Sequence, residues 1–514
     1  MRKVLIGVVA LILLAGAYYG VAVYPTRVFR TGLDRSIATL PNGVTVSYRS
    51  AQYSLLSHRA TVTGLDLRSI GPNAFELTVD ALALTRPETD LGAQWSRAAA
   101  APAAVPQDLA LAIADTVAAT GIRFNSDAMS ITLDRAQFGH PRLYPWALLR
   151  PGVPSLAQVQ ATLLSRINPQ PADIVAAFRA EAAWTLGFGY DSYRTGALRA
   201  AIFLPATPTS FATTATYRIR SSSGTGYDRG DIASESFAGV SFTGDRLGSV
   251  GIDKVTMAGI TMRQPLTRLL AGEPVTPAML DGLAVKRIQY GPMTIQPAAG
   301  PSSVLGTFTL GSVAFAHGVL VSADLALDGL TVTRAQLPNL QGVAAFDALG
   351  LDRMTLGLAA SYRWDLAQRR ITLRHTTLTV KELGALTLAL ELDDAVTGPD
   401  LARSIRLGRT VLRYDDASLA DRIIKLAAAR NGTDPAAFRQ QLIAVATRIG
   451  TDPNGDPASA AAGRALADFL AAPHSLTIAL DPPQPVPPAT LLFAASMPPR
   501  RLVALLGLTI AANR

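Results

Sequence analysis

Cysteine is absent from this chain, which excludes disulfide bonds, thiolate zinc sites, iron–sulfur ligation and cysteine nucleophiles. Lysine is scarce, so arginine carries nearly all of the positive charge. Charged residues make up only 17% of the chain, and no block of five or six like charges occurs. Nucleic-acid binding usually needs a clustered basic stripe or a known module, so the net charge of +9 does not predict it. Attraction to anionic lipid head groups fits the charge equally well.

Catalytic motifs are missing as well. There is no P-loop and no GxSxG elbow. The histidines lack an HExxH spacing, and we interpret all of them as turn or surface residues, with His375 in a strand; they are His58, His140, His317, His375 and His474. Gly224, Gly226 and Gly230 have the spacing GxGxxxG without a strand-to-helix context, which favours a flexible loop over a nucleotide site.

Two acidic patterns have a chemical and a structural interpretation. The segment from Asp452 to Asp456 resembles a calcium loop, but Gly463 stands where the bidentate carboxylate belongs, so a helix–helix turn is favoured. The pairs Asp393-Asp394 and Asp415-Asp416 suit either a general acid or the turn at a strand end, and we favour the turn. The sequence therefore predicts no catalytic, cofactor-binding or metal-binding residue, no cofactor, and a protein that is not an enzyme.

What the chain has in quantity is apolar sequence. Hydrophobic residues make up 49% of its 514 positions, which is enough for a substantial core and argues against wholesale disorder. At roughly 150 residues per domain the length suggests about three domains.

An uncharged, apolar segment lies near the N-terminus. Arg2 and Lys3 precede an uncharged segment from Val4 to Tyr24, long enough to cross a bilayer, and Pro25 is expected to end it. A cleaved signal peptide is the alternative, with Ala15-Gly16-Ala17 as its cleavage site. With either an anchor or a signal peptide, the rest of the chain would be exported from the cytoplasm. We expect a single-pass protein of the inner membrane with its body in the periplasm.

Composition changes along the chain predict six regions. They are 1–25, a transmembrane anchor or signal segment; 26–97, a β-rich region; 98–187, a helix-rich insertion; 188–416, the main β-sheet; 417–472, a helical subdomain; and 473–514, a C-terminal strand and tail. The predicted fold class is α+β: a largely antiparallel, curved β-sheet body with packed helices, plus an N-terminal transmembrane helix.

Alternation of apolar and polar residues is clearest from Leu351 to Leu392, where it predicts three consecutive antiparallel strands. In the insertion, by contrast, the Ala-rich segments 98–106 and 108–120 and the segment 171–184 favour helices. Near the C-terminus three helices are expected at 418–431, 435–450 and 459–472, with Asp434 as an N-cap, followed by a strand at 475–480.

A weak repeat places a glycine between apolar residues. Its copies are Val62–Leu67, Met257–Met262 and Leu327–Val332, with a looser copy at Phe315–Val321. Such glycines permit a bulge that curves a sheet, although chance similarity explains the repeat equally well.

Several of these features together resemble the AsmA-like and YdgA-like periplasmic proteins of Gram-negative bacteria. The resemblance rests on the N-terminal segment, on Leu40–Tyr48 leading into Ala60–Leu67, and on the alternating strands from Met354 to Leu392. It implies an anchored, β-rich protein in envelope maintenance or lipid traffic, with no catalytic residues to carry over.

The leading hypothesis is therefore a membrane-anchored envelope protein that binds or transfers lipid or maintains the envelope. Its expected partners are the membrane, through the N-terminal helix, and a lipid or another envelope protein, but no nucleic acid. The alternatives are an assembly scaffold that binds envelope proteins through strand edges, and, as a third hypothesis, an undetected hydrolase.

Overall fold

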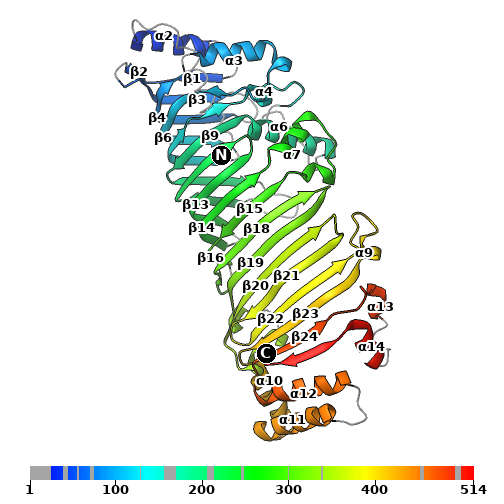
Figure 1. The fold of residues 1–514 in the computed structure, drawn as a ribbon. Helices are drawn as coiled ribbons and strands as arrows, with labels where there is room; N and C mark the ends of the chain where they lie inside the picture. The colour runs from blue at the N-terminus through cyan, green and yellow to red at the C-terminus, as the bar shows by residue number, and fades with distance from the viewer. Residues whose placement is uncertain are drawn as a thin grey trace. The chain divides into compact units, whose positions relative to one another are not determined.

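The computed structural model divides into two compact units, which are described separately (Figure 1). Unit 1 comprises residues 1–290 with 297–299, and unit 2 comprises residues 291–296 with 300–514. The structure describes residues 25–38, 44–54, 57–69, 74–88, 90–127, 129–154, 170–204, 213–244, 248–298, 300–336, 340–451, 457–492 and 499–513.

Unit 1 is built on an antiparallel sheet to which the chain adds strands in order. Its strands are β1 (Val44–Ser47), β2 (Ser50–Ser54), β3 (Arg59–Ser69), β4 (Phe75–Pro87), β5 (Leu111–Ala112), β6 (Ala114–Ser126), β7 (Met129–Gly139), β8 (Arg142–Leu143), β9 (Phe188–Thr195), β10 (Leu198–Leu204), β11 (Thr213–Ile219), β12 (Ser221–Asp228), β13 (Asp231–Gly244), β14 (Gly248–Thr261) and β15 (Ala284–Tyr290). The pairs β1/β2, β9/β10 and β11/β12 are each two halves of one interrupted strand, because both halves pair with the same neighbour.

The long strands of unit 1 share an irregularity at one level. Along most of β3, β4, β6 and β7 the inward residues are two apart, but at one shared level the spacing is three. The inward residues on either side of that point are Val62 and Leu65 in β3, Val79 and Leu82 in β4, Ala119 and Ile122 in β6, and Leu133 and Ala136 in β7. Two successive residues therefore point outward in each strand, which bends the sheet.

We call the outward residues at this level the kink row; its members include Arg49, Gly64, Asp80, Gly121, Arg220 and Gly239. Its glycines have positive φ angles, which are 59° at Gly64 and Gly121 and 60° at Gly239. A charged side chain from the neighbouring strand covers each glycine, as Arg49 covers Gly64 and Asp80 covers Gly121. Glycine is needed here because its φ is unfavourable for other residues and no space remains for a Cβ.

The main core of unit 1 lies on the inner face of this sheet. Its largest fully buried side chains include Phe124, Leu65, Leu77, Leu82 and Leu84. Helix α2 (Pro25–Ala38) packs Phe29 and Leu33 into this core. The Thr26 hydroxyl donates to the carbonyl oxygen of Tyr53 at 3.2 Å, which ties the helix to β2.

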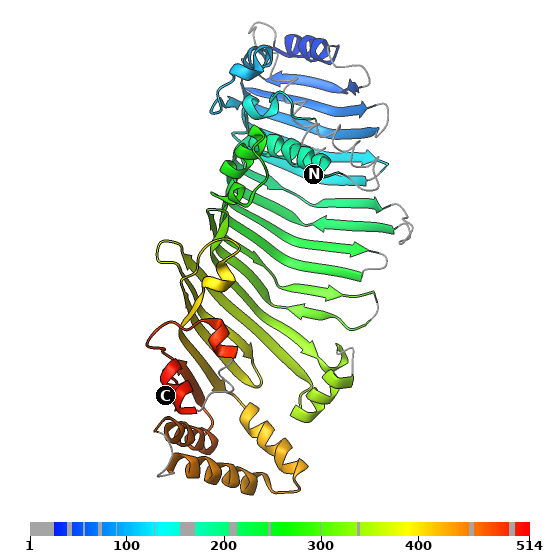
Figure 2. The ribbon, with the colours of Figure 1, turned by 90° about the vertical axis from the view of Figure 1, so that its right-hand side faces the viewer.

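Helices enter unit 1 in the connections between strands. They are α3 (Leu91–Ala100), η1 (Pro102–Ala104), α4 (Pro145–Leu148), α6 (Pro171–Leu186), α7 (Arg263–Ala271) and η2 (Pro277–Leu280). Ala98, Trp146, Ala183, Leu186 and Leu270 join α3, α4, α6 and α7 in a second, smaller core. Figure 2 shows α6 and α7 close together beside the strands.

Unit 2 is likewise an antiparallel sheet with helices in its connections. Its strands are β16 (Met293–Gln296), β17 (Ser303–Leu305), β18 (Thr307–Ala316), β19 (Val319–Thr333), β20 (Arg353–Asp365), β21 (Arg370–Val380), β22 (Gly384–Asp393), β23 (Arg406–Asp416), β24 (Ser475–Leu480) and β25 (Thr509–Ala512). Its helices are η3 (Arg334–Gln336), α8 (Leu340–Leu349), α9 (Leu401–Ser404), α10 (Leu419–Arg430), α11 (Pro435–Thr451), α12 (Pro457–Ala471), α13 (Pro488–Leu492) and α14 (Pro499–Leu506).

Most of the local predictions for unit 2 are confirmed. The three strands expected between 351 and 392 are β20, β21 and β22, paired in sequence order. The three helices expected after residue 417 are α10, α11 and α12, and the following strand is β24. The Asp434 carboxylate accepts hydrogen bonds from the backbone N–H groups of Ala436 and Ala437, both at 3.0 Å, as an N-cap should.

The predicted fold class is wrong, because it joined the body to a transmembrane helix. The described chain is mostly antiparallel β-sheet. None of its described helices is long and apolar enough to cross a membrane. The longest of them, α11, has 17 residues and carries Arg439 and Arg448, whereas a span needs about 20 apolar residues. The predicted segment from Val4 to Tyr24 lies outside the described residues, and Pro25 is the first residue of α2.

The helix expected at 108–120 is also wrong, because strands β5 and β6 occupy this segment. Its buried residues Val117, Ala119, Ile122 and Phe124 follow the spacing of the kink row, so the simple alternation of a strand is interrupted. The helix expected at 171–184 is confirmed as α6. The division into six regions stays a prediction.

The glycine repeat is a real structural feature in its three closer copies. Gly64, Gly259 and Gly329 all lie inside strands with positive φ, at 59°, 58° and 71°. The looser copy is different, because His317 and Gly318 form the turn between β18 and β19.

A candidate ligand-binding cavity

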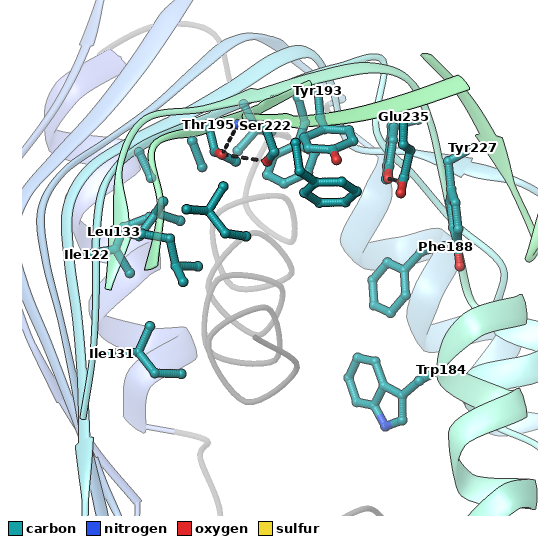
Figure 3. Close-up of a pocket in the computed structure, with 18 of the residues that line it drawn as sticks. Ile122, Ile131, Leu133, Trp184, Phe188, Tyr193, Thr195, Ser222, Tyr227 and Glu235 are labelled. Carbon is teal, nitrogen blue, oxygen red and sulfur yellow. Dashed lines mark hydrogen bonds between the residues drawn. The ribbon is translucent and has the colours of Figure 1, made fainter. Parts of the chain in front are cut away.

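Unit 1 has an apolar, partly open cavity of about 370 Å³ between the inner face of its sheet and the end of α6 (Figure 3). Fifteen of the 19 described lining residues are aliphatic or aromatic. The lining residues are Val117, Ala119, Ile122, Ile131, Leu133, Ala136, Phe138, Trp184, Thr185, Phe188, Tyr190, Tyr193, Thr195, Leu198, Ile219, Ser222, Tyr227, Glu235 and Phe237. The volume lies within the range of roughly 300–1,000 Å³ that is usual for small-molecule sites.

The two sides of the cavity differ in chemistry. Strands β6 and β7 contribute the branched aliphatic side chains Ile122, Ile131 and Leu133 on one side. Helix α6 and strands β9, β12 and β13 contribute rings and a carboxylate on the other side, where Figure 3 shows Trp184 and Glu235. The cavity is therefore amphipathic, with an aliphatic side and an aromatic, acidic side.

The rings of the aromatic side form a connected cluster. Tyr190 and Tyr227 stack with ring centroids 4.9 Å apart, and Tyr193 meets Tyr190 edge-on at 5.4 Å. Trp184 and Phe188 stack at 5.2 Å. Such offset and edge-on pairs hold the rings in fixed orientations.

Glu235 is the one acidic residue among the described lining residues, and it lies beside the tyrosines. The Tyr190 hydroxyl donates to its Oε1 at 3.4 Å. Burial raises the pKa of the Glu235 carboxyl above its ordinary value, and the hydrogen bond from Tyr190 opposes that shift only in part. No arginine, lysine or histidine is among the described lining residues, so the carboxylate has no cation on the cavity wall.

Hydroxyl groups supply the remaining polarity. The Thr195 and Ser222 hydroxyls lie 2.7 Å apart, and the backbone N–H of Ser222 donates to Thr195 at 3.2 Å. The Tyr227 hydroxyl donates to the carbonyl oxygen of Thr185 at 2.9 Å, which ties β12 to the end of α6.

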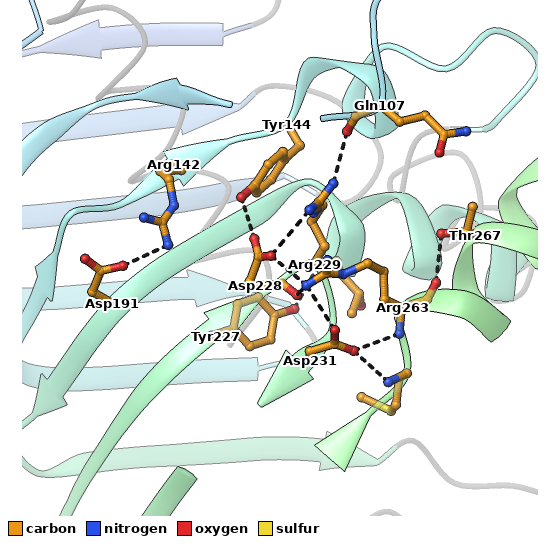
Figure 4. A network of polar contacts seen from close by, with 12 residues as sticks. Gln107, Arg142, Tyr144, Asp191, Tyr227, Asp228, Arg229, Asp231, Arg263 and Thr267 are labelled. Carbon is orange, nitrogen blue, oxygen red and sulfur yellow. Dashed lines mark hydrogen bonds and ion pairs between the residues drawn. The ribbon is translucent and has the colours of Figure 1, made fainter. Parts of the chain in front are cut away.

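A polar network lies at the turn between β12 and β13 (Figure 4). Asp228 accepts a hydrogen bond from the Tyr144 hydroxyl and pairs with Arg263 at 2.6 Å. Arg263 also pairs with Asp231 at 3.0 Å, and Arg229 lies over the Tyr144 ring at 4.7 Å. The network thus joins this turn to α4 and α7.

The electrostatics of this network favour a structural role. Burial, the largest influence on Asp228, raises its pKa, but the Tyr144 hydrogen bond and the charges of Arg229 and Arg263 together hold that pKa below its ordinary value. A carboxylate that stays ionised and is surrounded by donors stabilises the folded chain and is a poor general base.

The polar motifs singled out in the sequence occupy turns, bulges and strands. His58, His140, His317 and His375 all have positive φ, the first three in turns or bends and His375 as an exposed residue of β21. Among the described residues no group of three or more His, Asp or Glu side chains is arranged to hold a metal ion. The expected glycine loop is wrong, since Gly224 and Gly226 lie in β12 and only Gly230 is in a turn.

The acidic patterns are structural where they are described. Asp393, at the end of β22, pairs with Arg370 at 2.7 Å. Asp415 pairs with Arg413, and Asp416 accepts hydrogen bonds from the Tyr414 hydroxyl and the Ala420 N–H. The segment 452–456 lies outside the described residues.

The sequence did hold one signal for the cavity that we missed. Four aromatic residues stand within ten positions, at Trp184, Phe188, Tyr190 and Tyr193, although aromatic residues are only 6% of the chain. All four line the cavity.

Comparison with known proteins gives one finding. A protein-family model with the description "Uncharacterized protein" matches residues 371–513, a segment within unit 2 that begins in β21 and ends just after β25. No curated protein and no solved structure matches the chain. The matched segment does not include the cavity.

Proposed function

We propose that unit 1 binds the acyl or alkyl chain of a lipid in this cavity, and that the protein serves in lipid binding or transfer. The observation that supports the proposal is the cavity itself, with its volume of about 370 Å³ and its largely aliphatic and aromatic wall. The proposal is for a binding protein, and the acidic residues Asp228, Asp393 and Asp416 all make structural contacts.

The apolar wall favours an alkyl ligand for a simple energetic reason. A buried alkyl chain contributes about 0.8 kcal/mol for each methylene that leaves water. The aliphatic and aromatic side chains of the wall would shield several methylenes from water in this way.

Three further expectations stay predictions. The location in the cell envelope rests on the sequence and the stated resemblance alone. The alternative role as a scaffold for other envelope proteins, and the undetected hydrolase, have no described contact in their favour.

The test is native mass spectrometry of the full chain purified from cells, with lipid extraction of the same samples. Ala136, a buried residue on the cavity wall, is replaced by Phe to fill part of the cavity. The matched control is Ala233→Phe, because Ala233 is exposed on β13 and does not line the cavity.

We expect wild type and Ala233→Phe to carry a lipid-sized adduct and Ala136→Phe to carry much less of it. Thermal unfolding checks that both variants are folded. A wild-type chain that carries no adduct and takes up no added lipid would refute the proposal.

A further inference from the structure

We propose that the aromatic side of the cavity binds a positively charged ammonium group, so that the ligand is a long-chain amine or quaternary ammonium amphiphile. This inference rests on the proposed function and specifies the head group of its ligand. It follows from the position of Glu235 among the rings of Tyr190, Tyr193 and Tyr227.

The first step is the charge of Glu235. A carboxylate in apolar surroundings is unfavourable unless a cation or several hydrogen bonds compensate for the lost water. Among the described residues Glu235 forms no ion pair, and its side chain accepts one long hydrogen bond, of 3.4 Å, from Tyr190. The wall therefore presents an acceptor whose complement is a cation supplied by a ligand.

The second step is the arrangement of the rings. Cations bind favourably over the faces of aromatic rings, and quaternary ammonium groups are commonly recognised by several rings together. The described rings near Glu235 come from different strands, Tyr190 and Tyr193 from β9 and Tyr227 from β12. Their mutual distances of 4.9 Å and 5.4 Å make them one continuous aromatic surface beside the carboxylate.

The third step is the other side of the cavity. Ile122, Ile131 and Leu133 offer aliphatic surface with no polar side chain among them. A ligand with its charge next to Glu235 would place its alkyl chain against this surface. The cavity thus matches an amphiphile with a cationic end better than an anionic or a neutral one.

The test compares three probes with the same alkyl chain: hexadecyltrimethylammonium, hexadecan-1-ol and hexadecanoate. Each is titrated below its micelle concentration into the full, delipidated chain at neutral pH, with binding followed by calorimetry. The proteins are wild type, Glu235→Gln and the matched control Glu273→Gln, since Glu273 is exposed in the same unit and outside the cavity. Tyr190→Phe, which keeps the ring and removes the hydroxyl, is a second variant.

We expect wild type to bind the ammonium probe about tenfold more tightly than the alcohol, as a desolvated cation beside rings and a carboxylate would. Glu235→Gln should abolish this preference and leave binding of the alcohol unchanged, which also shows that the variant is folded. Glu273→Gln should keep the preference, whereas Tyr190→Phe should weaken it, because the hydrogen bond that favours the ionised Glu235 is lost.

Equal binding of the ammonium probe and the alcohol to wild type would overturn the head-group inference and leave the proposed function standing. Preference for hexadecanoate would overturn it too, because it would mean that a protonated Glu235 pairs with a carboxyl. Loss of all three probes in Glu235→Gln would assign Glu235 a structural role. Binding of no probe to wild type would count against the proposed function itself.

Discussion

The ring of Tyr193 occupies the space into which a Cβ at position 224 would project. The Cβ of any larger residue at Gly224 would lie under 3.0 Å from Tyr193 Cε1, a separation that real Cβ atoms essentially never show. Gly224 lies in β12 and Tyr193 in the adjacent strand β9, directly across from it. The absence of a side chain at Gly224 therefore leaves room for the Tyr193 ring on the aromatic side of the cavity.

Gly224→Ala is expected to push Tyr193 out of place and weaken binding of alkyl probes. The control is Gly251→Ala in β14, because a Cβ there would meet nothing within 4 Å. Neither glycine has a positive φ, so backbone strain is not a factor in the comparison. Titration of hexadecan-1-ol should show weaker binding for the first variant only. Equal affinities in both variants would show that the ring position does not shape the cavity.

Glu235→Gln should make the delipidated chain more stable at neutral pH. The folded-state pKa of Glu235 is raised above 4.5 by burial, so its stabilising, protonated form is lost as the pH rises through that pKa. Tyr190, Tyr193 and Tyr227 face it, and burial raises the pKa values of Tyr190 and Tyr193, so these two stay neutral in this range. Urea unfolding should show a gain for the variant at neutral pH that disappears below pH 4.5. A gain that does not depend on pH would exclude this carboxyl as the cause.

Asp228→Asn should make the chain less stable at neutral pH. The pKa of Asp228 is held below 3.8, so its contribution is present above that pH and is lost as the pH falls through the folded-state pKa. We expect a loss of about 2 kcal/mol at neutral pH, as for hydrogen bonds to a charged group, and a smaller difference in acid. Asp253→Asn is the control, since Asp253 is exposed on β14. Chemical denaturation at several pH values measures both, and similar losses in the two variants would contradict the assigned role of the network.

Gly121→Ala tests the kink row. The new Cβ would overlap the Asp80 side chain, which also pairs with Arg123 at 3.1 Å, and the φ of 59° would be strained. Gly152→Ala is the control for backbone strain alone, because Gly152 has φ 77° and nothing within 4 Å of its Cβ position.

We expect the control to lose about 1 kcal/mol and Gly121→Ala to lose clearly more, measured as the free energy of unfolding. Equal losses would mean that the close approach of Asp80 adds nothing to the need for glycine at this position.

The regular parts of the fold were predictable where one physical signal dominated. From 351 to 392 apolar and polar residues alternate along most of each strand, and the three strands β20 to β22 follow directly. The helices α10 to α12 were predictable from their apolar faces and from the cap at Asp434. The helix predicted at 108–120 was wrong because the alanines favour a helix and the kink row interrupts the alternation of a strand. Pairing with β4 and β7 makes this segment a strand instead.

The cavity was not predictable from local patterns. Its wall combines residues from β6 to β13, and Ile131 and Glu235 come together only through the order and register of the strands. Glu235 has no distinguishing neighbours in the sequence. Only the aromatic segment that includes Trp184 and Tyr190 was visible in advance, and it does not by itself specify a ligand.

The aligned irregularities of β3, β4, β6 and β7 have an architectural consequence. Because these four strands bend at the same height, the curvature that they share arises within each strand separately. A hairpin inserted or removed in register would make this sheet wider or narrower without changing its bend. Evolution could then change the number of strands one hairpin at a time while the curvature of the sheet stayed constant.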